Sequence, residues 1–398
     1  MSLSELDLFR VRIAMVQAFL RDNNYDGVLF NRPDNFAMAT GGKRNFIYLF
    51  SDLGACSLYV DKNGKVYFVG NTIEEPRMFA EELGGLGVES KNYLWFEGNP
   101  AAKVKKEFTG NIVSDDGSIG KNVHGELAPL RALLTETEIE KYRRAGALAA
   151  ESMMAVLDSI KPGDLETDIA ARIIAEGSKR RALVPVALVA ADERIALHRH
   201  PLPTVGPLVN GSLEERAVKG YVMVVGCYMR EGLVVSMTRF KQVGDLPDYV
   251  PAAFERICGV DALMQEASVA GKTIGDVFAA CQNGYATLGF PNNEWHNHHQ
   301  GGLTGYAGRT IKGSPGVPYP ILDQSYAKKV KEIAGIDVSF GHAFAWNPSA
   351  KGVKSEDTFV LLPNGTQEIV TATPKLPRID LTKVLGRPCT IAKSGIAQ

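Results

Sequence analysis

The sequence predicts an α/β domain at its N-terminal end, followed by a larger α+β domain. Its 398 residues suggest roughly two or three domains. Up to about residue 130, short apolar segments alternate with segments of helical periodicity, as in small α/β domains. The remainder twice repeats the order of two helices followed by strands. We therefore place the domains at residues 1–133 and 134–398, with an aperiodic tail from about residue 377 that we expect to wrap the surface.

The first domain begins with an amphipathic helix over residues 5–22, where apolar residues recur at helical spacing. Residues 27–30 form a short buried strand. Residues 56–70 predict a β-hairpin around an Asn-Gly pair, because these two residues adopt the positive φ angles of a tight turn. A further helix is expected over residues 73–83.

The second domain opens with a long helix over residues 135–160. Thr135 can cap its first turn, and Glu138 stands where it completes a capping box. A Pro-Gly pair ends this helix, and a second helix from Thr167 leads to a strand over residues 183–191. The other expected elements are two strands within residues 220–240 that turn at 230–232, helices over about 248–269 and 274–287, and strands over 342–347 and 356–363.

The charge balance argues against several classes of partner. The chain carries 44 Lys and Arg residues against 45 Asp and Glu residues, for a formal net charge of −1. Binding to nucleic acid or to a membrane surface usually needs a basic excess, so we expect neither partner. No apolar run approaches the ~20 residues of a membrane span, and the first segment lacks the pattern of a signal peptide. Five scattered cysteines fit reduced thiols, and these features together predict a cytoplasmic protein.

Six segments of the second domain carry a specific resemblance. In chain order they are 135-TETEIEKYRRAGALA-149, Ile160-Lys161-Pro162-Gly163, Met237-Thr238-Arg239-Phe240, His299-Gln300-Gly301-Gly302, Asn347-Pro348 and Ser355-Glu356-Asp357-Thr358. In this order they resemble motifs of the pita-bread family, which includes creatinase, Xaa-Pro dipeptidase, aminopeptidase P and methionine aminopeptidase. The resemblance implies a creatinase-like α/β N-terminal domain, a pita-bread α+β C-terminal domain and a homodimer.

The peptidases of this family hold two divalent metal ions with two Asp, one His and two Glu ligands. The resemblance places these five positions at Val225, Ser236, His299, Asn347 and Glu356. Valine cannot ligate, and serine and asparagine bring no charge, whereas two buried dications need several anionic oxygens. The expectation is therefore no paired-metal centre and no cofactor. The alternative is one divalent ion at Glu356 and His299, or at Glu356 and one of the neighbouring His298 and His296.

The residues that remain suit acid–base catalysis, for which creatinase is the family's metal-free precedent. His299 and Glu356 could form an acid–base unit, because a neighbouring carboxylate raises the pKa of an imidazole and fixes its tautomer. Lys354 could pair with the same carboxylate. The family's peptidases also place a histidine after the third strand, and His198 or His200 matches it. His200 is favoured because two nearby prolines restrict its backbone. The structural alternatives are a functionless His–Glu pair and ordinary loop histidines.

Further residues are candidates for substrate binding. Arg239 and Arg309 each carry a forked guanidinium that suits a carboxylate, and a structural role is the alternative for each. Core packing is the alternative for Trp346. Cys227 is expected to be buried and inert. The full set of substrate-binding candidates is Arg239, Arg309, Tyr306, Asn347, Ser236 and Trp346.

These observations favour a metal-independent hydrolase that cleaves a C–N bond of a small, carboxylate-bearing metabolite by His/Glu acid–base chemistry. One alternative is a metal-dependent peptidase similar to Xaa-Pro dipeptidase, acting on a dipeptide-like substrate. The other is a non-catalytic protein that binds a small molecule in the same site. Fold alone does not choose among the three, because function depends on the site.

Overall fold

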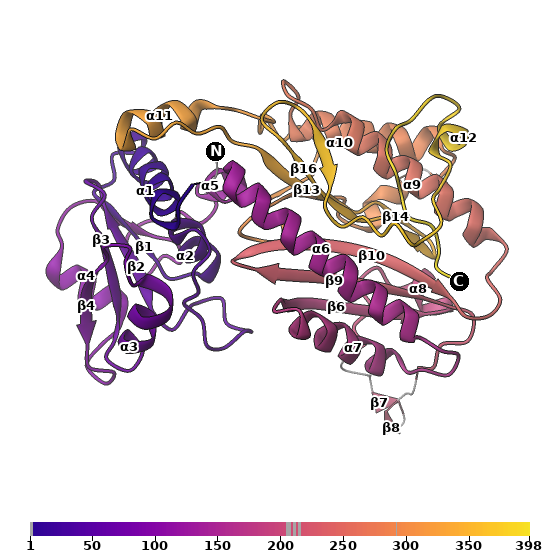
Figure 1. The fold of residues 1–398 in the computed structure, drawn as a ribbon, viewed down its shortest axis with the longest axis horizontal. Coiled ribbons are helices and arrows are strands. Elements are labelled where there is room, and N and C mark those ends of the chain that lie inside the picture. The colour runs from indigo at the N-terminus through magenta and orange to yellow at the C-terminus, as the bar shows by residue number, and fades with distance from the viewer. Residues whose placement is uncertain (1–2, 204–207, 210–211, 214–215, 292) are drawn as a thin grey trace.

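The chain folds into two lobes that lie side by side (Figure 1). The smaller lobe holds the N-terminal sheet, and the larger lobe holds the remaining sheets, with helix α6 (Glu136–Ser159) running along it. The mixed α/β class predicted from the sequence is confirmed. The computed structural model describes residues 3–203, 208–209, 212–213, 216–291 and 293–398.

The smaller lobe is built on a five-stranded sheet in the order β4-β3-β2-β1-β5. Its strands are β1 (Gly27–Phe30), β2 (Ser57–Asp61), β3 (Val66–Asn71), β4 (Glu89–Tyr93) and β5 (Ile112–Ser114). Strand β1 pairs antiparallel with β2 and parallel with β5, and all of its residues are buried. The helices are α1 (Glu5–Asp22), α2 (Pro33–Thr40), α3 (Glu75–Arg77), the π-helical turn η1 (Met78–Leu83), α4 (Pro100–Glu107) and α5 (Ala128–Ala132).

Most of the expected elements of this lobe are confirmed. Helix α1 and strand β1 have the predicted bounds, and β2 and β3 form the predicted hairpin. The helix expected over residues 73–83 is wrong in kind, because α3 passes directly into the π-helical turn η1. Helices α2 and α4 have no counterpart in the prediction. Each is only eight residues long and starts with a proline. Proline fits the first turn of a helix, but in a sequence it also indicates the end of a helical segment.

The larger lobe contains two main sheets, each accompanied by a pair of long helices, as the repeated order of elements predicts. The first sheet has the order β10-β9-β6, and the second has the order β12-β11-β13-β16-β17. The first half comprises α6, α7 (Glu166–Lys179), β6 (Leu183–Ala191), α8 (Glu193–Leu197), β7 (Leu208–Val209), β8 (Ser212–Leu213), β9 (Tyr221–Arg230) and β10 (Leu233–Gln242). The second half comprises α9 (Tyr249–Ala267), α10 (Ile274–Thr287), the 3-10 turn η2 (Glu294–Asn297), β11 (Gly301–Thr304), β12 (Ile311–Lys312), α11 (Ser325–Ala334), β13 (His342–Trp346), β14 (Ser349–Ala350), β15 (Val353–Lys354), β16 (Asp357–Leu361), β17 (Gln367–Ile369) and α12 (Leu381–Leu385).

A buried ion pair joins the two lobes at the start of α6. Glu138 completes the predicted capping box with Thr135. Its carboxylate also accepts a 2.8 Å hydrogen bond from Nε of Arg12 on α1, and neither charged side chain is exposed. The Arg12 guanidinium donates further to the carbonyl of Leu133 at 2.8 Å, and the Tyr306 hydroxyl donates to the same carboxylate. Arg12 therefore ties the first helix to the second lobe.

The tail from about residue 377, expected to wrap the surface, is tied to the larger lobe by a short helix and by strand-edge contacts. The chain after β17 forms α12, and its last residues pair with the edge of β10. The amide of Ala397 donates to the carbonyl of Phe240 at 2.9 Å, and the amide of Gln242 donates to the carbonyl of Ala397 at 2.8 Å. Lys393 is buried and lies 2.7 Å from a carboxylate oxygen of Asp261 on α9. Apolar side chains of the tail also pack against the core of the larger lobe: Ile379, Leu381, Leu385, Ile391 and Ile396.

One exposed segment of the smaller lobe is rich in apolar side chains. The segment between α2 and β2 exposes a group of large apolar side chains, here called the apolar loop: Ile47, Tyr48, Leu49, Phe50 and Leu53. The predicted homodimer stays a prediction, as does the domain boundary between residues 133 and 134, which falls between α5 and α6. Within the described part of the chain, no helix is both long and apolar enough to cross a membrane.

The first testable prediction concerns the pair between the lobes. Replacing Arg12 by alanine leaves the buried charge of Glu138 without its cation, so we expect a loss of about 3–5 kcal/mol in the free energy of unfolding. Urea denaturation at neutral pH measures it. The matched control is Arg10→Ala on the exposed side of α1, where the pair with Asp7 is solvated and the loss should stay within about 1 kcal/mol. Equal losses in the two variants would contradict the assignment.

Candidate functional site

The β9–β10 hairpin supplies two of the positions where the resemblance expects metal-binding carboxylates. Val225 on β9 is buried among apolar side chains, and it offers no ligand atom. Ser236 on β10 is also buried and lies opposite Cys227 in the sheet. The Cys227 sulfur is 3.2 Å from the Ser236 hydroxyl, and burial raises the pKa of the thiol, in line with the expectation of an inert cysteine. These positions therefore bring no negative charge.

Glu356 is the one carboxylate that remains among the five positions, and both of its oxygens accept hydrogen bonds. Oε1 accepts from Nη2 of Arg309 at 2.7 Å and from the side-chain amide of Asn347 at 3.3 Å. Oε2 accepts from the Thr238 hydroxyl at 2.7 Å and lies 3.6 Å from Nζ of Lys354. Burial alone raises the pKa of this carboxyl, but the two cations outweigh burial and lower it to about 2. Glu356 is thus a fixed anion that does not exchange protons near neutral pH.

Arg309 and Lys354 provide the positive charge beside Glu356. The Arg309 guanidinium spans two of the expected ligand positions, since Nη1 also donates to the Ser236 hydroxyl at 3.3 Å. The predicted pairing of Lys354 with Glu356 is confirmed. A carboxylate already balanced by two monocations has no charge left for two dications. The residues present therefore do not fit the paired-metal centre of the family's peptidases. The alternative of one ion at His299 and Glu356 stays a prediction, although Arg309 and Lys354 already pair with that carboxylate.

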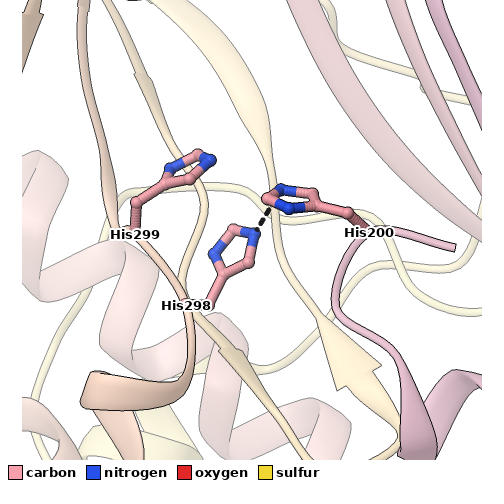
Figure 2. A group of neighbouring side chains, drawn as sticks. All are labelled: His200, His298 and His299. Atoms are coloured by element: carbon pink, nitrogen blue, oxygen red, sulfur yellow. Dashed lines mark hydrogen bonds between the residues drawn. The ribbon is translucent and has the colours of Figure 1, made fainter.

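Three histidines gather near this charged group (Figure 2). His200 follows α8, whereas His298 and His299 lie between η2 and β11. One ring nitrogen from each lies within 4.8 Å of the other two. Nε2 of His298 is 3.0 Å from Nε2 of His200, and the rings of His298 and His299 stack with centroids 4.3 Å apart. His298 is buried, while His200 and His299 are exposed to solvent.

All three imidazoles have a lowered pKa. Burial, followed by the charge of Lys354, lowers the pKa of His298 to about 2. Burial and then Arg309 lower the pKa of His299 to about 4, and burial also lowers that of His200. Glu356 does raise the pKa of His299, as expected, but burial and the nearby cations outweigh it, so the net shift is downward. The histidines are therefore neutral at pH 7, with lone pairs available.

A glycine allows the histidine segment to approach β13. Gly301 has φ +88°, a conformation that other residues adopt only with strain, and a Cβ there would lie 2.1 Å from the carbonyl oxygen of Ala345. The close pairing of β11 with β13 follows from this absence of a side chain. This pairing positions His299, which lies two residues before the start of β11. The amide of Gly301 donates to Nδ1 of His299 at 3.4 Å.

Several residues expected in the site have structural contacts instead. Arg239 is buried and pairs with Asp357 at 2.5 Å, so it is not free for a substrate. Tyr306 is buried at the junction of the lobes against Glu138. Trp346 is fully buried in the core. For these three residues the interpretation as substrate ligands is corrected to a structural role.

Of the two candidate histidines after the third strand, only His200 lies in the three-histidine group. His198 is exposed and lies outside the three-histidine group, whereas His200 bonds to His298. His298 is predicted only as a possible metal ligand, although the run of histidines around it is visible in the sequence. Asn347 and Ser236 do reach the charged group, through Glu356 and Arg309.

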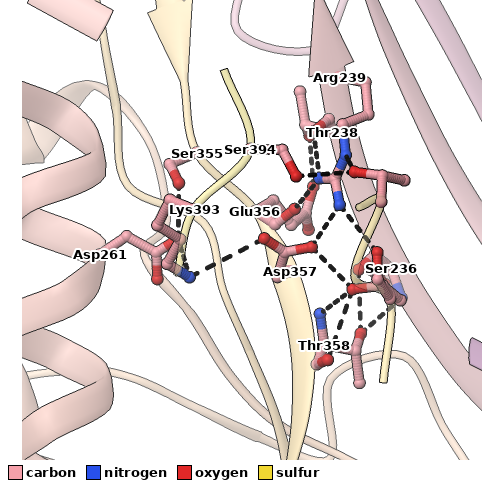
Figure 3. Close-up of polar contacts among 12 residues, drawn as sticks. Ser236, Thr238, Arg239, Asp261, Ser355, Glu356, Asp357, Thr358, Lys393 and Ser394 are labelled. Carbon is pink, nitrogen blue, oxygen red and sulfur yellow. Dashed lines mark hydrogen bonds and ion pairs between the residues drawn. The ribbon is translucent and has the colours of Figure 1, made fainter. Parts of the chain in front are cut away.

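A second buried network supports the chain on both sides of Glu356, which directly precedes β16 (Figure 3). Lys393 from the tail lies between Asp261 on α9, at 2.7 Å, and Asp357 on β16, at 4.0 Å. The Ser355 hydroxyl donates to Asp261 at 2.6 Å, and Asp357 pairs with Arg239. Residues on either side of Glu356 are thus anchored, which holds its carboxylate in place.

Comparison with solved structures identifies the architecture. A prolidase from Thermococcus sibiricus superimposes with a TM-score of 0.68 at 17% identity, over 91% of this chain and 96% of that one. A dipeptidase from Pyrococcus horikoshii OT3 gives 0.67 at 16% identity, over 91% and 98%. The N-terminal domain of the FACT complex subunit SPT16 from chickpea, Cicer arietinum, gives 0.60 at 10% identity, over 95% and 99%. Neither protein-family models nor curated proteins match the sequence. The predicted creatinase-like and pita-bread architecture is confirmed at the level of fold.

The second prediction concerns acid stability. His298 has a pKa of about 2 when folded and an ordinary value of 6.5 when unfolded, so below pH 6.5 only the unfolded chain takes up its proton. The stability that neutral His298 contributes is present above pH 6.5 and is lost as the pH falls, by about 2 kcal/mol between pH 7 and 5. Urea denaturation across this range should show a shallower pH dependence in His298→Gln. His296→Gln, on the exposed neighbouring turn, should keep the wild-type slope; identical slopes in all three proteins would rule out the assignment.

Proposed function

We propose that this chain is a hydrolase that cleaves a C–N bond of a small, carboxylate-bearing compound without a paired-metal centre. The observation that carries the proposal is the pairing of Glu356 with Arg309 and Lys354, beside three neutral histidines. Two fixed monocations stand where the family's peptidases hold dications. The chemistry left to the site is proton transfer by imidazole.

His299 and His200 are the proposed acid–base residues, because both are exposed and neutral. The imidazole takes a proton from water while the water oxygen attacks the carbon of the C–N bond. The C–N bond then breaks, and the proton passes from the imidazolium to the leaving nitrogen. His298 acts as a positioning residue, since its bond to Nε2 of His200 holds that ring. Glu356 contributes charge and orientation but no proton.

The charged group also suggests how a substrate is recognised. Arg309, Lys354 and Glu356 sum to one positive charge, which favours an anionic substrate. Among the described residues, Nε of Arg309 is buried and has no hydrogen-bond partner. A substrate carboxylate could accept from this nitrogen. Oδ1 of Asn347 likewise lacks a partner within the described chain, and it could accept from a substrate N–H.

The third prediction tests turnover. A panel of N-acyl, N-carbamoyl and N-amidino amino acids, together with Xaa-Pro dipeptides, is incubated with protein pretreated with EDTA. We expect release of amine from at least one carboxylate-bearing compound, and a fall in kcat of about 10²–10⁴-fold in His299→Gln, because the imidazole base is lost. The exposed His296→Gln should keep wild-type kcat. The rate should hold from pH 8 to about 5 and fall as the pH approaches 4, where His299 is protonated.

Two outcomes would overturn this proposal. Turnover that EDTA abolishes and manganese restores would instead make the chain a metallopeptidase similar to the dipeptidases that share its fold. Saturable binding of a compound in the panel without any turnover would make it a non-catalytic binding protein. In that case His299→Gln should leave the affinity nearly unchanged.

We also propose that the protein is a cytoplasmic homodimer. All five cysteines are free, as expected in a reducing compartment. The apolar loop exposes Tyr48 and Phe50 together, and a second copy of the chain could cover them. As the fourth prediction, light scattering should give the mass of a dimer for the wild type and of a monomer for Phe50→Ser. Leu202→Ser, an exposed apolar residue elsewhere, is the control that should remain dimeric. A monomeric wild type would refute the dimer.

A further inference from the structure

The geometry points to a second use of the three-histidine group: we propose that His200, His298 and His299 bind one transition-metal ion of the zinc, nickel or copper class, and that this ion inhibits turnover. The site differs from the paired-metal centre in its ligands, because it contains imidazoles and no carboxylate. The binding part stands on geometry alone. The inhibitory part rests on the proposed function, since a lone pair donated to a metal is not available to a proton.

The spacing of the nitrogens supports one ion. Two imidazoles on a tetrahedral zinc, each with a bond of ~2.0–2.1 Å, place their nitrogens ~3.3 Å apart. The two Nε2 atoms of His200 and His298 are 3.0 Å apart, so they already have nearly this spacing. The third nitrogen lies within 4.8 Å of both, and His299 is exposed, so its ring can turn inward. Figure 2 shows the three rings grouped together, with a hydrogen bond between those of His200 and His298.

The contact between the two Nε2 atoms indicates what an ion would replace. A hydrogen bond between two imidazole nitrogens needs one proton between two lone pairs. A metal ion can take the place of that proton and accept both lone pairs. His298 is buried, and its Nδ1 has no hydrogen bond of acceptable geometry within the described chain. The ring is therefore held by its backbone and by His200, and is available as a ligand.

Hydrogen bonds fix the backbone around His298 before any ion binds. The side-chain amide of Gln300 donates to the carbonyl of His298 at 2.6 Å and to that of Trp295 at 2.8 Å. The Tyr285 hydroxyl donates to Gln300 at 3.1 Å, and all of these bonds are buried or nearly so. A ligand fixed in this way loses little freedom when it binds an ion.

The donor set selects the class of metal. Neutral imidazoles suit zinc, copper and nickel, whereas magnesium, calcium and manganese prefer carboxylate and other oxygen ligands. Glu356 is not available as a fourth ligand, because Arg309 and Lys354 hold it. The positive charge of Lys354 weakens binding of any cation, so its removal should strengthen it. With three protein ligands, the fourth position is open to water.

The fifth prediction tests binding directly. Protein stripped with EDTA and dialysed is titrated with Zn²⁺ and Mn²⁺ by calorimetry, and with Co²⁺ by visible absorption. We expect one Zn²⁺ per chain, no saturable Mn²⁺ binding, and the intense d–d bands of four-coordinate Co²⁺. His298→Ala should weaken Zn²⁺ binding by at least about tenfold. His296→Ala is the matched control and should bind as the wild type does, whereas Lys354→Met should bind more tightly.

The outcomes separate the metal site from the proposed function. No saturable Zn²⁺ binding, or equal weakening by His296→Ala and His298→Ala in proteins with wild-type circular dichroism, would overturn the site. If the site binds Zn²⁺ and the apoprotein turns over substrate, stoichiometric Zn²⁺ should stop turnover and EDTA should restore it. Full turnover with Zn²⁺ bound would overturn the inhibitory part. Binding without turnover in any state would leave the site intact and refute only the proposed function.

Discussion

The site depends on how one buried carboxylate is neutralised. Glu356 lies out of solvent, where an unpaired charge costs several kcal/mol, and it is stable there only because Arg309 and Lys354 accompany it. This pairing determines the electrostatic surroundings of the rest of the site. The paired carboxylate keeps its charge near neutral pH, and it allows two positive groups to lie near the histidines. Those cations and burial together keep the imidazoles neutral.

Proton transfer, metal binding and recognition of an anionic substrate all depend on this arrangement of charges. Neutral imidazoles can accept a proton from water, or donate lone pairs to a soft metal, but not both at once. A net positive charge next to them favours an anionic substrate. The fold itself is common to prolidases and dipeptidases and to a domain of a FACT subunit. Because such different proteins share this fold, the fold positions the side chains but does not determine their chemistry. The function therefore depends on the specific residues of the site.

The sequence predicts the fold better than it predicts the site. Periodicity and a capping box at Thr135 locate the long helices, because these signals are local. The absence of a carboxylate at Val225 is likewise visible in the sequence alone. The partners of Glu356 are harder, since Arg309 lies far away in the chain and its guanidinium has several plausible partners. His200 and His298 are also distant in sequence, so only the folded chain brings them together. The pKa of His299 depends on burial and on the charges of several residues that are distant in sequence, so no sequence motif indicates it.

The junction at Arg12 has a consequence for the independence of the lobes. Glu138 caps its own helix with one oxygen and accepts Arg12 with the other, so the second lobe carries half of a buried pair whose cation belongs to the first. A protein assembled from this second lobe alone, or from it and a foreign first lobe, would need a new cation or an uncharged residue at this position. The two lobes have therefore to be inherited and expressed as one unit, and recombination between related chains should conserve this pair or replace both members together.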